Sequence, residues 1–256
     1  MHCLAGWLVG WGKVLSKPHD SRKTLIIPQN LNSDESTRKS VINTETDLLQ
    51  KLGSKAITKE ELLQKAEQDF SLLFAILKGT SSSKAIIRYG CAKVLVDLSQ
   101  KYPEKLYPHI DDFIVLLDSK YRILTWNAMA IIANLTKVDR DRKFDAIFDQ
   151  YYGFLNNEYM VTVANVVGNS AKIALAKPHL VQRITTELLK VENIKLTPHL
   201  TAECKRVIIE HTIKSFDVFF EKIEAREQVL SFAKKQLHST RASVRKEAQS
   251  FLEKRD

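Results

Sequence analysis

Trp126 and Asn127 are adjacent in LLDSKYRILTWNAMAIIANL, residues 116–135, where they interrupt a strongly apolar stretch. The pair is either an active-site pair or part of a structural repeat. An amide such as that of Asn127 cannot stabilise a developing cation as a carboxylate would, so the pair is a poor catalytic set. We interpret Asn127 as a repeat-contact residue and keep Trp126 as a candidate for binding.

Histidines are the second group that could carry chemistry, because neutral imidazole is a common metal ligand. Four of the six prolines precede a histidine, at Pro18, Pro108, Pro178 and Pro198. Three of these dipeptides open predicted helices, where proline is favoured in the first turn. The sequence contains no H-E-x-x-H motif and no His-Glu dipeptide. We therefore expect no metal site and no cofactor.

Motifs for nucleotide binding and nucleophilic catalysis are absent from the sequence. There is no GxGxxG and no GxxxxGK[ST]; GTSSSK, residues 79–84, resembles a phosphate loop only superficially and follows no predicted strand. No Ser/His/Asp or Cys/His set falls on a recognisable nucleophile elbow. These absences indicate a protein that is not an enzyme.

The elements that position these residues are predicted to be helices. Thr58 followed by Glu61 resembles a capping box, and apolar residues then recur at helical spacing from Leu62 to Leu77. Ten helices in five pairs are predicted from there to the C-terminus. One column of small or aliphatic residues marks the middle of each second helix and recurs about every 40 residues. Its members are Cys91, Ala128, Val166, Ile208 and Ala248.

This pattern resembles the HEAT repeats of the armadillo-like helical superfamily. The resemblance is carried by LLDSKYRILTWNAMAIIANL and LHSTRASVRKEAQSFL, in which a leucine-rich first helix and a short polar break precede a V-R-x-x-A-like segment. IIRYGCAKVLVDL matches the second half of the motif, whereas MVTVANVVGNSAKIA and CKRVIIEHTIKSF fit it loosely. The resemblance covers residues 60–256. It implies an all-α fold, a right-handed α-solenoid of about five HEAT-like helical pairs.

In this superfamily the second helices line the concave surface, which implies a binding face for this chain. Trp126 lies two residues before the buried column. The equivalent position in the other repeats is mostly aromatic or cationic, and the position one residue earlier holds further cations. The candidate partner-binding residues are Arg88, Tyr89, Trp126, Lys205, Arg206, Arg245 and Lys246. Aromatic and arginine side chains are common anchors of protein interfaces, and the same mixture suits a nucleic-acid backbone with stacked bases. Alternatively, Tyr89 and Trp126 only cover the seam between repeats.

Two enzymatic branches of the superfamily fit this sequence poorly. DNA glycosylases that excise alkylated bases use aromatic residues and an aspartate on the concave face, but this chain contains no Trp-Asp pair. Di-iron hydroxylases of the HEAT type use His-Glu dipeptides, which are also absent.

The composition limits the classes of partner and the cellular compartment that we expect. The net charge is +9, which attracts nucleic acid, anionic lipid or acidic proteins, but both signs of charge are interspersed along the chain. A solvated surface with a lysine bias is the simpler interpretation. Three widely spaced cysteines argue against a disulfide framework and favour a reducing compartment, so we expect a cytoplasmic protein.

The N-terminal part lacks the sustained helical periodicity of the rest. Residues 1–57 are predicted to be a flexible or loosely attached leader, and residues 58–256 to form the solenoid. Within the leader, residues 1–15 place apolar side chains at helical spacing, so peripheral membrane contact stays an alternative, although three glycines weaken such a helix. No stretch approaches the ~20 apolar residues of a spanning helix, and no secretory signal is expected.

Together these features predict a non-enzymatic interaction or scaffold module that binds a protein partner through the concave face. A nucleic-acid-binding protein with a basic concave face is the alternative, and a glycosylase-like enzyme is less favoured. The sequence does not indicate the partner or the biological process.

Overall fold

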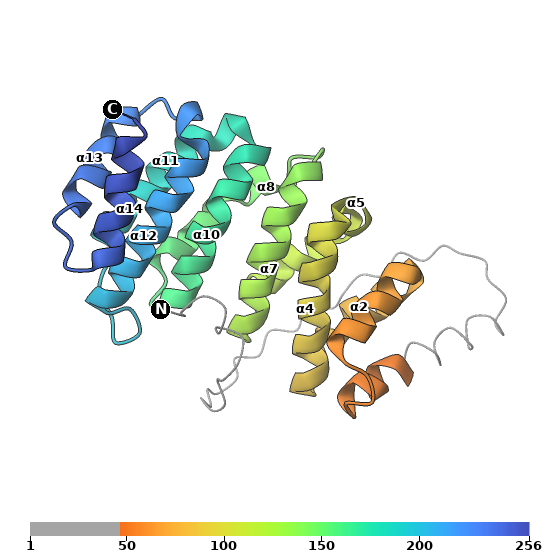
Figure 1. The fold of residues 1–256 in the computed structure, drawn as a ribbon. Coiled ribbons are helices and arrows are strands. Elements are labelled where there is room, and N and C mark those ends of the chain that lie inside the picture. The colour runs from red at the N-terminus through yellow and green to blue at the C-terminus, as the bar shows by residue number, and fades with distance from the viewer. Residues whose placement is uncertain (1–46, 256) are drawn as a thin grey trace.

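The computed structural model describes residues 47–255, and every regular element in this range is helical (Figure 1). The second helices of the repeats form one layer, in which they stand side by side in chain order (Figure 1). They are α4 (Ala85–Lys101), α7 (Arg122–Leu135), α10 (Met160–Ala176), α12 (Ala202–Phe219) and α14 (Ala242–Glu253). The predicted all-α solenoid is confirmed.

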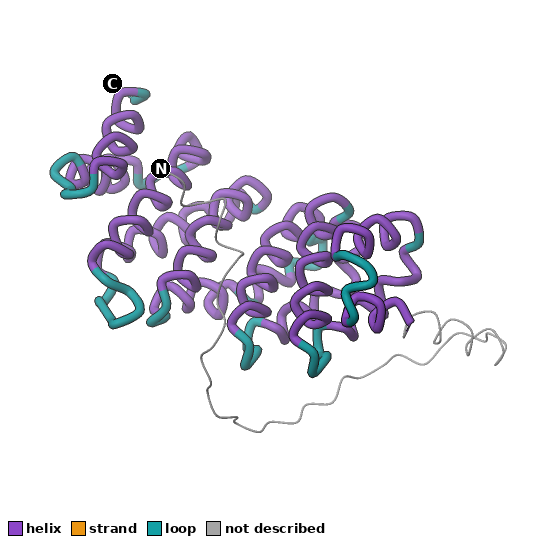
Figure 2. Tube along the Cα trace, turned by 60° about the horizontal axis from the view of Figure 1, so that its bottom comes forward, coloured by secondary structure: helices purple, strands orange, loops and turns teal. Residues whose placement is uncertain are grey.

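The first helices form the other layer (Figure 2). They are broken by short 3-10 turns. Proline explains several of the breaks, because it is favoured at a helix start and lacks the N–H that a continuous helix needs. The layer comprises α2 (Lys59–Gln68), η1 (Phe70–Leu72) and α3 (Leu73–Gly79); α5 (Pro103–Leu106), η2 (Tyr107–His109) and α6 (Ile110–Leu116); α8 (Lys143–Ala146), α9 (Phe148–Gly153) and η4 (Phe154–Asn156); η5 (Pro178–Leu180), α11 (Val181–Leu189) and η6 (Lys190–Asn193); and α13 (Arg226–Gln236). Two further turns, η3 (Thr136–Val138) and η7 (Phe220–Lys222), follow α7 and α12.

The core runs continuously between the two layers. Every member of the predicted column is fully buried: Cys91, Ala128, Val166, Ile208 and Ala248. Small side chains at this position allow the second helices to approach their neighbours closely, and the larger apolar residues on either side fill the space that remains. The column of residues that recurs about every 40 positions in the sequence therefore lies in one continuous core.

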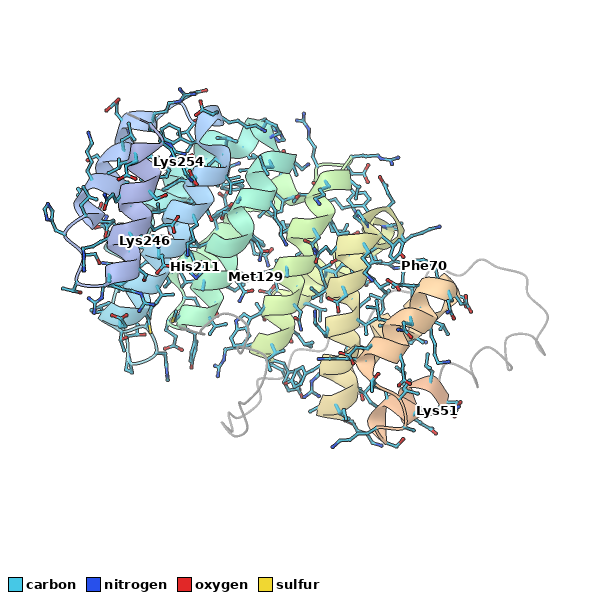
Figure 3. The ribbon with its side chains drawn as sticks, in the orientation of Figure 1. Lys51, Phe70, Met129, His211, Lys246 and Lys254 are labelled. Carbon is cyan, nitrogen blue, oxygen red and sulfur yellow. The ribbon has the colours of Figure 1, made fainter. Side chains whose placement is uncertain are left out.

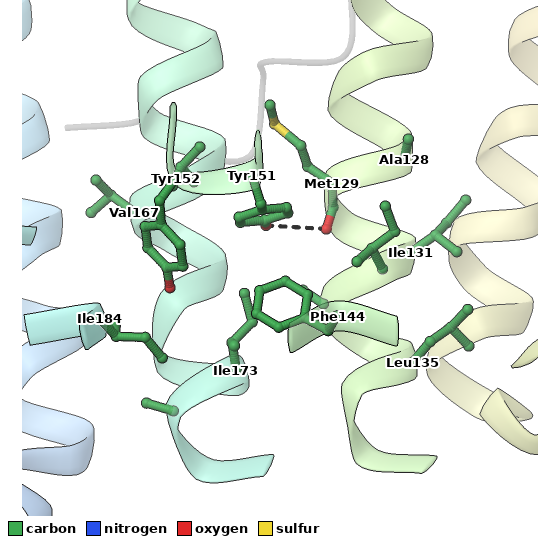
Figure 4. Close-up of a cluster of buried hydrophobic side chains, with 14 of the residues drawn as sticks. Ala128, Met129, Ile131, Leu135, Phe144, Tyr151, Tyr152, Val167, Ile173 and Ile184 are labelled. Carbon is green, nitrogen blue, oxygen red and sulfur yellow. Dashed lines mark hydrogen bonds between the residues drawn. The ribbon is translucent and has the colours of Figure 1, made fainter. Parts of the chain in front are cut away.

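Buried aromatic side chains fill the centre of the molecule between α7 and α10 (Figure 4). Tyr151 donates its hydroxyl to the carbonyl of Met129 (3.2 Å), and Tyr152 donates to Ser170 Oγ (3.1 Å). Each phenol thus buries its ring and satisfies its polar end. Burial raises the pKa of both tyrosines, so both stay neutral.

A helix over residues 47–53 precedes α2 and packs into the core through Leu48 and Leu52. A Cβ on Gly90 would lie 3.0 Å from Leu52 Cδ2, so glycine permits this close approach. The body expected to begin at residue 58 therefore also includes residues 47–57, because Leu48 and Leu52 belong to the core and Leu52 packs against Gly90 of α4. The rest of the predicted leader, including the proposed membrane contact over residues 1–15, lies outside the described residues.

Among the described helices, none combines the length and the apolar character that crossing a membrane requires.

Candidate binding surface

The outward side of the second helices forms a continuous surface, which we call the second-helix face. It consists of the residues two and one before the buried column and two after it, none of which is buried. These residues are Tyr89, Gly90, Lys93, Trp126, Asn127, Ala130, Ala164, Asn165, Gly168, Arg206, Val207, Glu210, Lys246, Glu247 and Ser250. The part on α7 and α10 is uncharged, and the parts on α4, α12 and α14 carry charges.

Trp126 is fixed at the joint between α7 and α10. Its indole Nε1 donates to Thr162 Oγ1 at 3.0 Å, and the side chain is half-buried. Tyr89 makes a comparable contact one repeat earlier, where its ring packs edge-on against Tyr121 with centroids 6.4 Å apart. Both aromatics therefore contact the following repeat, as the seam alternative predicted, and both keep part of their surface exposed.

Small side chains beside Trp126 form an uncharged strip on the second-helix face, at Gly168, Ala164 and Ala130. Gly168 is exposed, and a Cβ added to it would meet no atom within 4 Å. Ala130 and Ala164 continue the strip toward Trp126 on the same face. Such a surface admits the backbone of another chain at close range.

Amides border this strip. Asn165 donates from Nδ2 to the carbonyl of Val161 (2.8 Å), which fixes its orientation and leaves its oxygen as an acceptor. Asn127 makes no side-chain hydrogen bond within residues 47–255, so its amide stays available to a ligand. No hydrogen bond supports the repeat-contact role predicted for Asn127.

Arg88 does not belong to the exposed surface, which corrects its prediction as a partner-binding residue. It is only 5% exposed. Its guanidinium carbon lies 3.8 Å from the centroid of the Tyr121 ring and 4.7 Å from that of Tyr89. Nη1 donates to the carbonyl of Ser82 at 2.7 Å. Arg88 therefore ties the loop before α4 to the next repeat.

The remaining cationic candidates lie two and three helices away from Trp126, on α12 and α14. Arg206 pairs with Glu203 at 2.8 Å, and Arg245 donates to the carbonyl of Ser239 at 2.7 Å. Lys205 is half-buried, and Lys246 is exposed on α14 (Figure 3). Because α10 stands between α7 and these helices, the structure does not join Trp126 and the cations into one cluster.

Four polar contacts cross from the α7 side to the α10 side, spread along the length of these helices. Arg122 lies over the Tyr159 ring, 4.0 Å from its centroid, at the N-terminal end. Trp126 bonds Thr162, and Lys172 Nζ donates to Asn134 Oδ1 at 3.0 Å. At the C-terminal end, Lys177 Nζ lies 2.7 Å from Asp139 Oδ2. We call this set the α7–α10 seam.

Asp139 is the centre of a buried network at the C-terminal end of the seam. Its side chain has no exposed surface, and it accepts from Lys177, from Tyr107 Oη (2.7 Å) and from the backbone N–H of Lys143 (2.9 Å) and Phe144 (3.0 Å). Lys177 also lies 3.2 Å from Asp145 Oδ2. Every lone pair needed for a buried carboxylate is therefore used, and the network joins two consecutive repeats.

The network sets the protonation of its members. Burial alone would raise the pKa of Asp139, but the hydrogen bonds from Lys177, Tyr107 and the backbone hold that pKa below its ordinary value. Burial and the bond to Asp139 raise the pKa of Tyr107 to about 12. Sequence inspection missed this group; its one signal is Asp139 directly after an apolar helix, in TKVDRDRK.

The histidines of the Pro-His dipeptides are separated in the structure. His109 lies 3.6 Å from Asp112, His179 lies 2.5 Å from Asp145, and His199 stacks on Tyr159 with centroids 4.5 Å apart. Over residues 47–255, no three side chains of His, Cys, Asp or Glu are placed together to hold a metal ion. His19 lies outside the described residues.

No protein-family model and no curated protein sequence matches the chain. Solved structures do: the designed armadillo repeat protein YIII(Dq)4CqI aligns at 19% identity over 87% of this chain and 95% of its own, with a TM-score of 0.52. The designed armadillo repeat protein YIII(Dq.V1)4CPAF in complex with peptide (KR)4 aligns at 16% identity over 87% and 95%, with a TM-score of 0.54.

A third match is the crystal structure of computationally designed armadillo repeat proteins for modular peptide recognition. It aligns at 18% identity over 86% of this chain and 94% of its own, with a TM-score of 0.51. At these identities the likeness concerns the fold and not the function. The chain therefore has an armadillo/HEAT-like helical-repeat fold.

Proposed function

We propose that the protein is a non-enzymatic interaction module that binds an extended segment of a partner protein across its second-helix face. The observation that carries this proposal is the uncharged strip of small residues at Gly168, Ala164 and Ala130, with open space above Gly168. Trp126 borders it as a half-buried anchor, and the Asn127 amide borders it as a hydrogen-bonding group.

The structural neighbours support a peptide as the ligand class. One of them is described in complex with the peptide (KR)4, and another was designed for modular peptide recognition. The uncharged strip of this chain would suit a segment whose central residues are uncharged. Exposed amides satisfy the backbone groups of an extended segment, which otherwise lose hydrogen bonds to water on binding.

A nucleic-acid backbone fits this face less well. Its centre carries no cation, and the cations toward the C-terminal end have acidic neighbours. Arg206 pairs with Glu203, and Lys246 is adjacent to Glu247 in the sequence. Counterion release from a phosphate backbone requires a row of cations without such partners.

Gly168→Trp tests the proposal directly, because the new Cβ would meet no atom within 4 Å and the bulky side chain would cover part of the strip. Gly153→Trp is the matched control: Gly153 lies on α9 in the other layer, and a Cβ there also meets nothing within 4 Å. Peptides would be selected from a random display library on the wild-type protein. Their dissociation constants for wild type, Gly168→Trp, Gly153→Trp and Trp126→Ala would then be measured by fluorescence polarisation.

We expect Gly168→Trp and Trp126→Ala to weaken binding about tenfold or more, as loss of a central anchor does, and Gly153→Trp to bind like wild type. Equal binding by wild type and Gly168→Trp would overturn the proposal. A labelled DNA duplex at about 50 mM salt would be titrated in parallel. Tight duplex binding that Gly168→Trp does not change would favour the nucleic-acid alternative.

A further inference from the structure

A pocket of about 310 Å³ opens where the C-terminal ends of α7 and α10 meet the start of α8, on the edge that carries the α8 label in Figure 1. This is within the usual size range of ligand sites, about 300–1,000 Å³. Its lining includes four cationic residues, Lys137, Arg140, Arg142 and Lys177. They come from η3, from the loop that follows it and from the residue after α10, so four positive charges converge from two repeats.

Only part of this charge is neutralised by the protein. Lys177 is balanced by Asp139 and Asp145, and Arg140 pairs with Glu104 at 3.1 Å. Neither Lys137 nor Arg142 has an ion-pair or hydrogen-bond partner for its side chain anywhere in the described range 47–255. Two positive charges at the pocket are therefore uncompensated.

Lys172 shows that the positive potential extends past the pocket. Burial lowers the pKa of Lys172, and the charge of Lys137 lowers it further. Its side-chain nitrogen has the neutral Asn134 oxygen as its hydrogen-bond acceptor. An anion in the pocket would relieve this repulsion between two ammonium groups.

Arg142 adds an independent observation from the backbone. Its φ of 55° and ψ of 34° place it in the left-handed region, which is unfavourable for a residue with a Cβ. Asp139 holds the next two backbone N–H groups, those of Lys143 and Phe144, and so fixes the conformation. Such outliers cluster at ligand sites, where the surrounding structure maintains them.

We propose that this pocket binds a phosphate group, presented as a dianionic monoester or as free phosphate. A phosphate carries a charge of about −1.5 to −2 at pH 7, so it could pair with both cations that have no partner in the protein. The guanidinium fork of Arg142 suits two phosphate oxygens, and Lys137 supplies a point charge. The pocket lies at one edge of the molecule and not on the strip around Gly168, so it does not depend on the function proposed above.

The test is a calorimetric titration of the full chain in a low-salt chloride buffer. The probes are inorganic phosphate, N-acetyl-O-phosphoserine amide and the corresponding serine compound. The double variant Lys137→Gln/Arg142→Gly removes both uncompensated cations, and glycine at 142 is favoured by the left-handed backbone. Lys234→Gln/Lys246→Gln is the matched control, because it removes two exposed cations from α13 and α14, the helices of the last described repeat.

We expect both phosphate probes to bind the wild type and the serine compound not to bind. The double variant should lose about tenfold or more in affinity and should unfold at the wild-type temperature or above, whereas the control should bind like wild type. Tighter binding of phosphoserine than of phosphate would identify a phosphorylated partner as the source; equal affinities would identify a free anion.

The proposal would be overturned by the absence of heat with both phosphate probes. It would also be overturned if the double variant kept its affinity, or if the control lost as much, since the effect would then reflect net charge alone. Gly168→Trp should bind both phosphate probes normally, so failure of this inference and failure of the peptide-binding proposal are distinguishable.

Discussion

Arg88 and Arg245 occupy the same position in an early repeat and in the last described repeat. Each donates from Nη1 to the carbonyl of a serine six residues earlier, at 2.7 Å in both cases. Yet Arg88 is buried and Arg245 is exposed. Tyr121 of the next repeat covers Arg88, whereas no described helix beyond α14 covers Arg245. The repeat motif therefore determines the local hydrogen bond, and the neighbouring repeat determines the burial.

Two acids show the same contrast. Asp139, at the C-terminal end of the α7–α10 seam, has no exposed side-chain surface. Asp217 on α12 pairs with Lys254 (2.5 Å) and Arg255 (2.7 Å) of the last repeat, and its side chain is 24% exposed. Both acids join successive repeats. Water reaches Asp217 but not Asp139, so the two acids should contribute differently to the free energy of unfolding.

The largest expected effect comes from Asp139→Asn. This change leaves the buried Lys177 ammonium with one carboxylate fewer, and breaking a buried ion pair typically costs about 3–5 kcal/mol. Asp217→Asn should cost about 1 kcal/mol, because its partly exposed pairs are screened by solvent. Urea unfolding monitored by circular dichroism measures both. Equal losses for the two variants would contradict the role assigned to burial.

Acid titration sharpens this prediction. The pKa of Asp139 in the folded protein lies below its ordinary value of 3.8. The ionised carboxylate therefore contributes its full stabilisation of the fold above about pH 4. This contribution is lost as the pH falls through the lower pKa of the folded state. The free energy of unfolding of wild type should therefore decrease below about pH 4. Asp139→Asn should show a shallower decrease, with the remainder due to the other carboxyls whose pKa values are lowered, among them Asp145, Glu210 and Asp217. An unchanged slope would exclude Asp139 as a contributor.

Arg88→Ala should have the second largest effect, about 2–3 kcal/mol. It removes a charge-assisted hydrogen bond and a desolvated cation–π contact with Tyr121. Arg245→Ala should cost at most about 0.5 kcal/mol, as substitutions at exposed positions usually do. Thermal unfolding followed by calorimetry measures the difference. Arg88→Lys should fall between the two, because an ammonium lacks the planar fork.

Gly168→Ala should have the smallest effect and the opposite sign. Replacing glycine inside a helix stabilises by about 0.5–1 kcal/mol where the new Cβ meets nothing, as at Gly168. Gly90→Ala should gain less or nothing, since its Cβ would press on Leu52 from the neighbouring helix. Chemical denaturation of both variants gives the comparison. If Gly90→Ala gained as much free energy of unfolding as Gly168→Ala, contact with Leu52 would have no effect at Gly90.

The parts of the structure that depend on one repeat alone could be predicted from the sequence. Periodicity identified the buried column, from Cys91 to Ala248, because each repeat carries its own apolar stripe. It assigned Arg88 to the wrong environment, because Tyr121, which covers that residue, belongs to another repeat. It also placed residues 47–57 in the leader and missed the Asp139 network, whose members are separated by more than thirty residues.

The candidate surface could be predicted only in outline. Spacing placed Trp126 beside the buried column of a second helix, but the strip beside it depends on Gly168 having no neighbour within 4 Å of an added Cβ. Absence of a neighbour has no sequence signal. The same limit applies to the pocket at Arg142, whose backbone conformation is imposed by hydrogen bonds to a side chain three residues before it.

The distribution of polar contacts between second helices has a mechanical consequence. Directional bonds and a cation–π contact lock α7 to α10 from end to end. Between α10 and α12, Tyr159 stacks on His199 in front of the two helices, Thr197 Oγ1 donates to the carbonyl of Glu158 (2.7 Å), and Ser215 Oγ donates to the carbonyl of Val167 (2.8 Å). Apolar contact is non-directional and tolerates small sliding. We therefore expect the joint between α7 and α10 to be stiff along its whole length, so that bending under load concentrates at other joints of the solenoid.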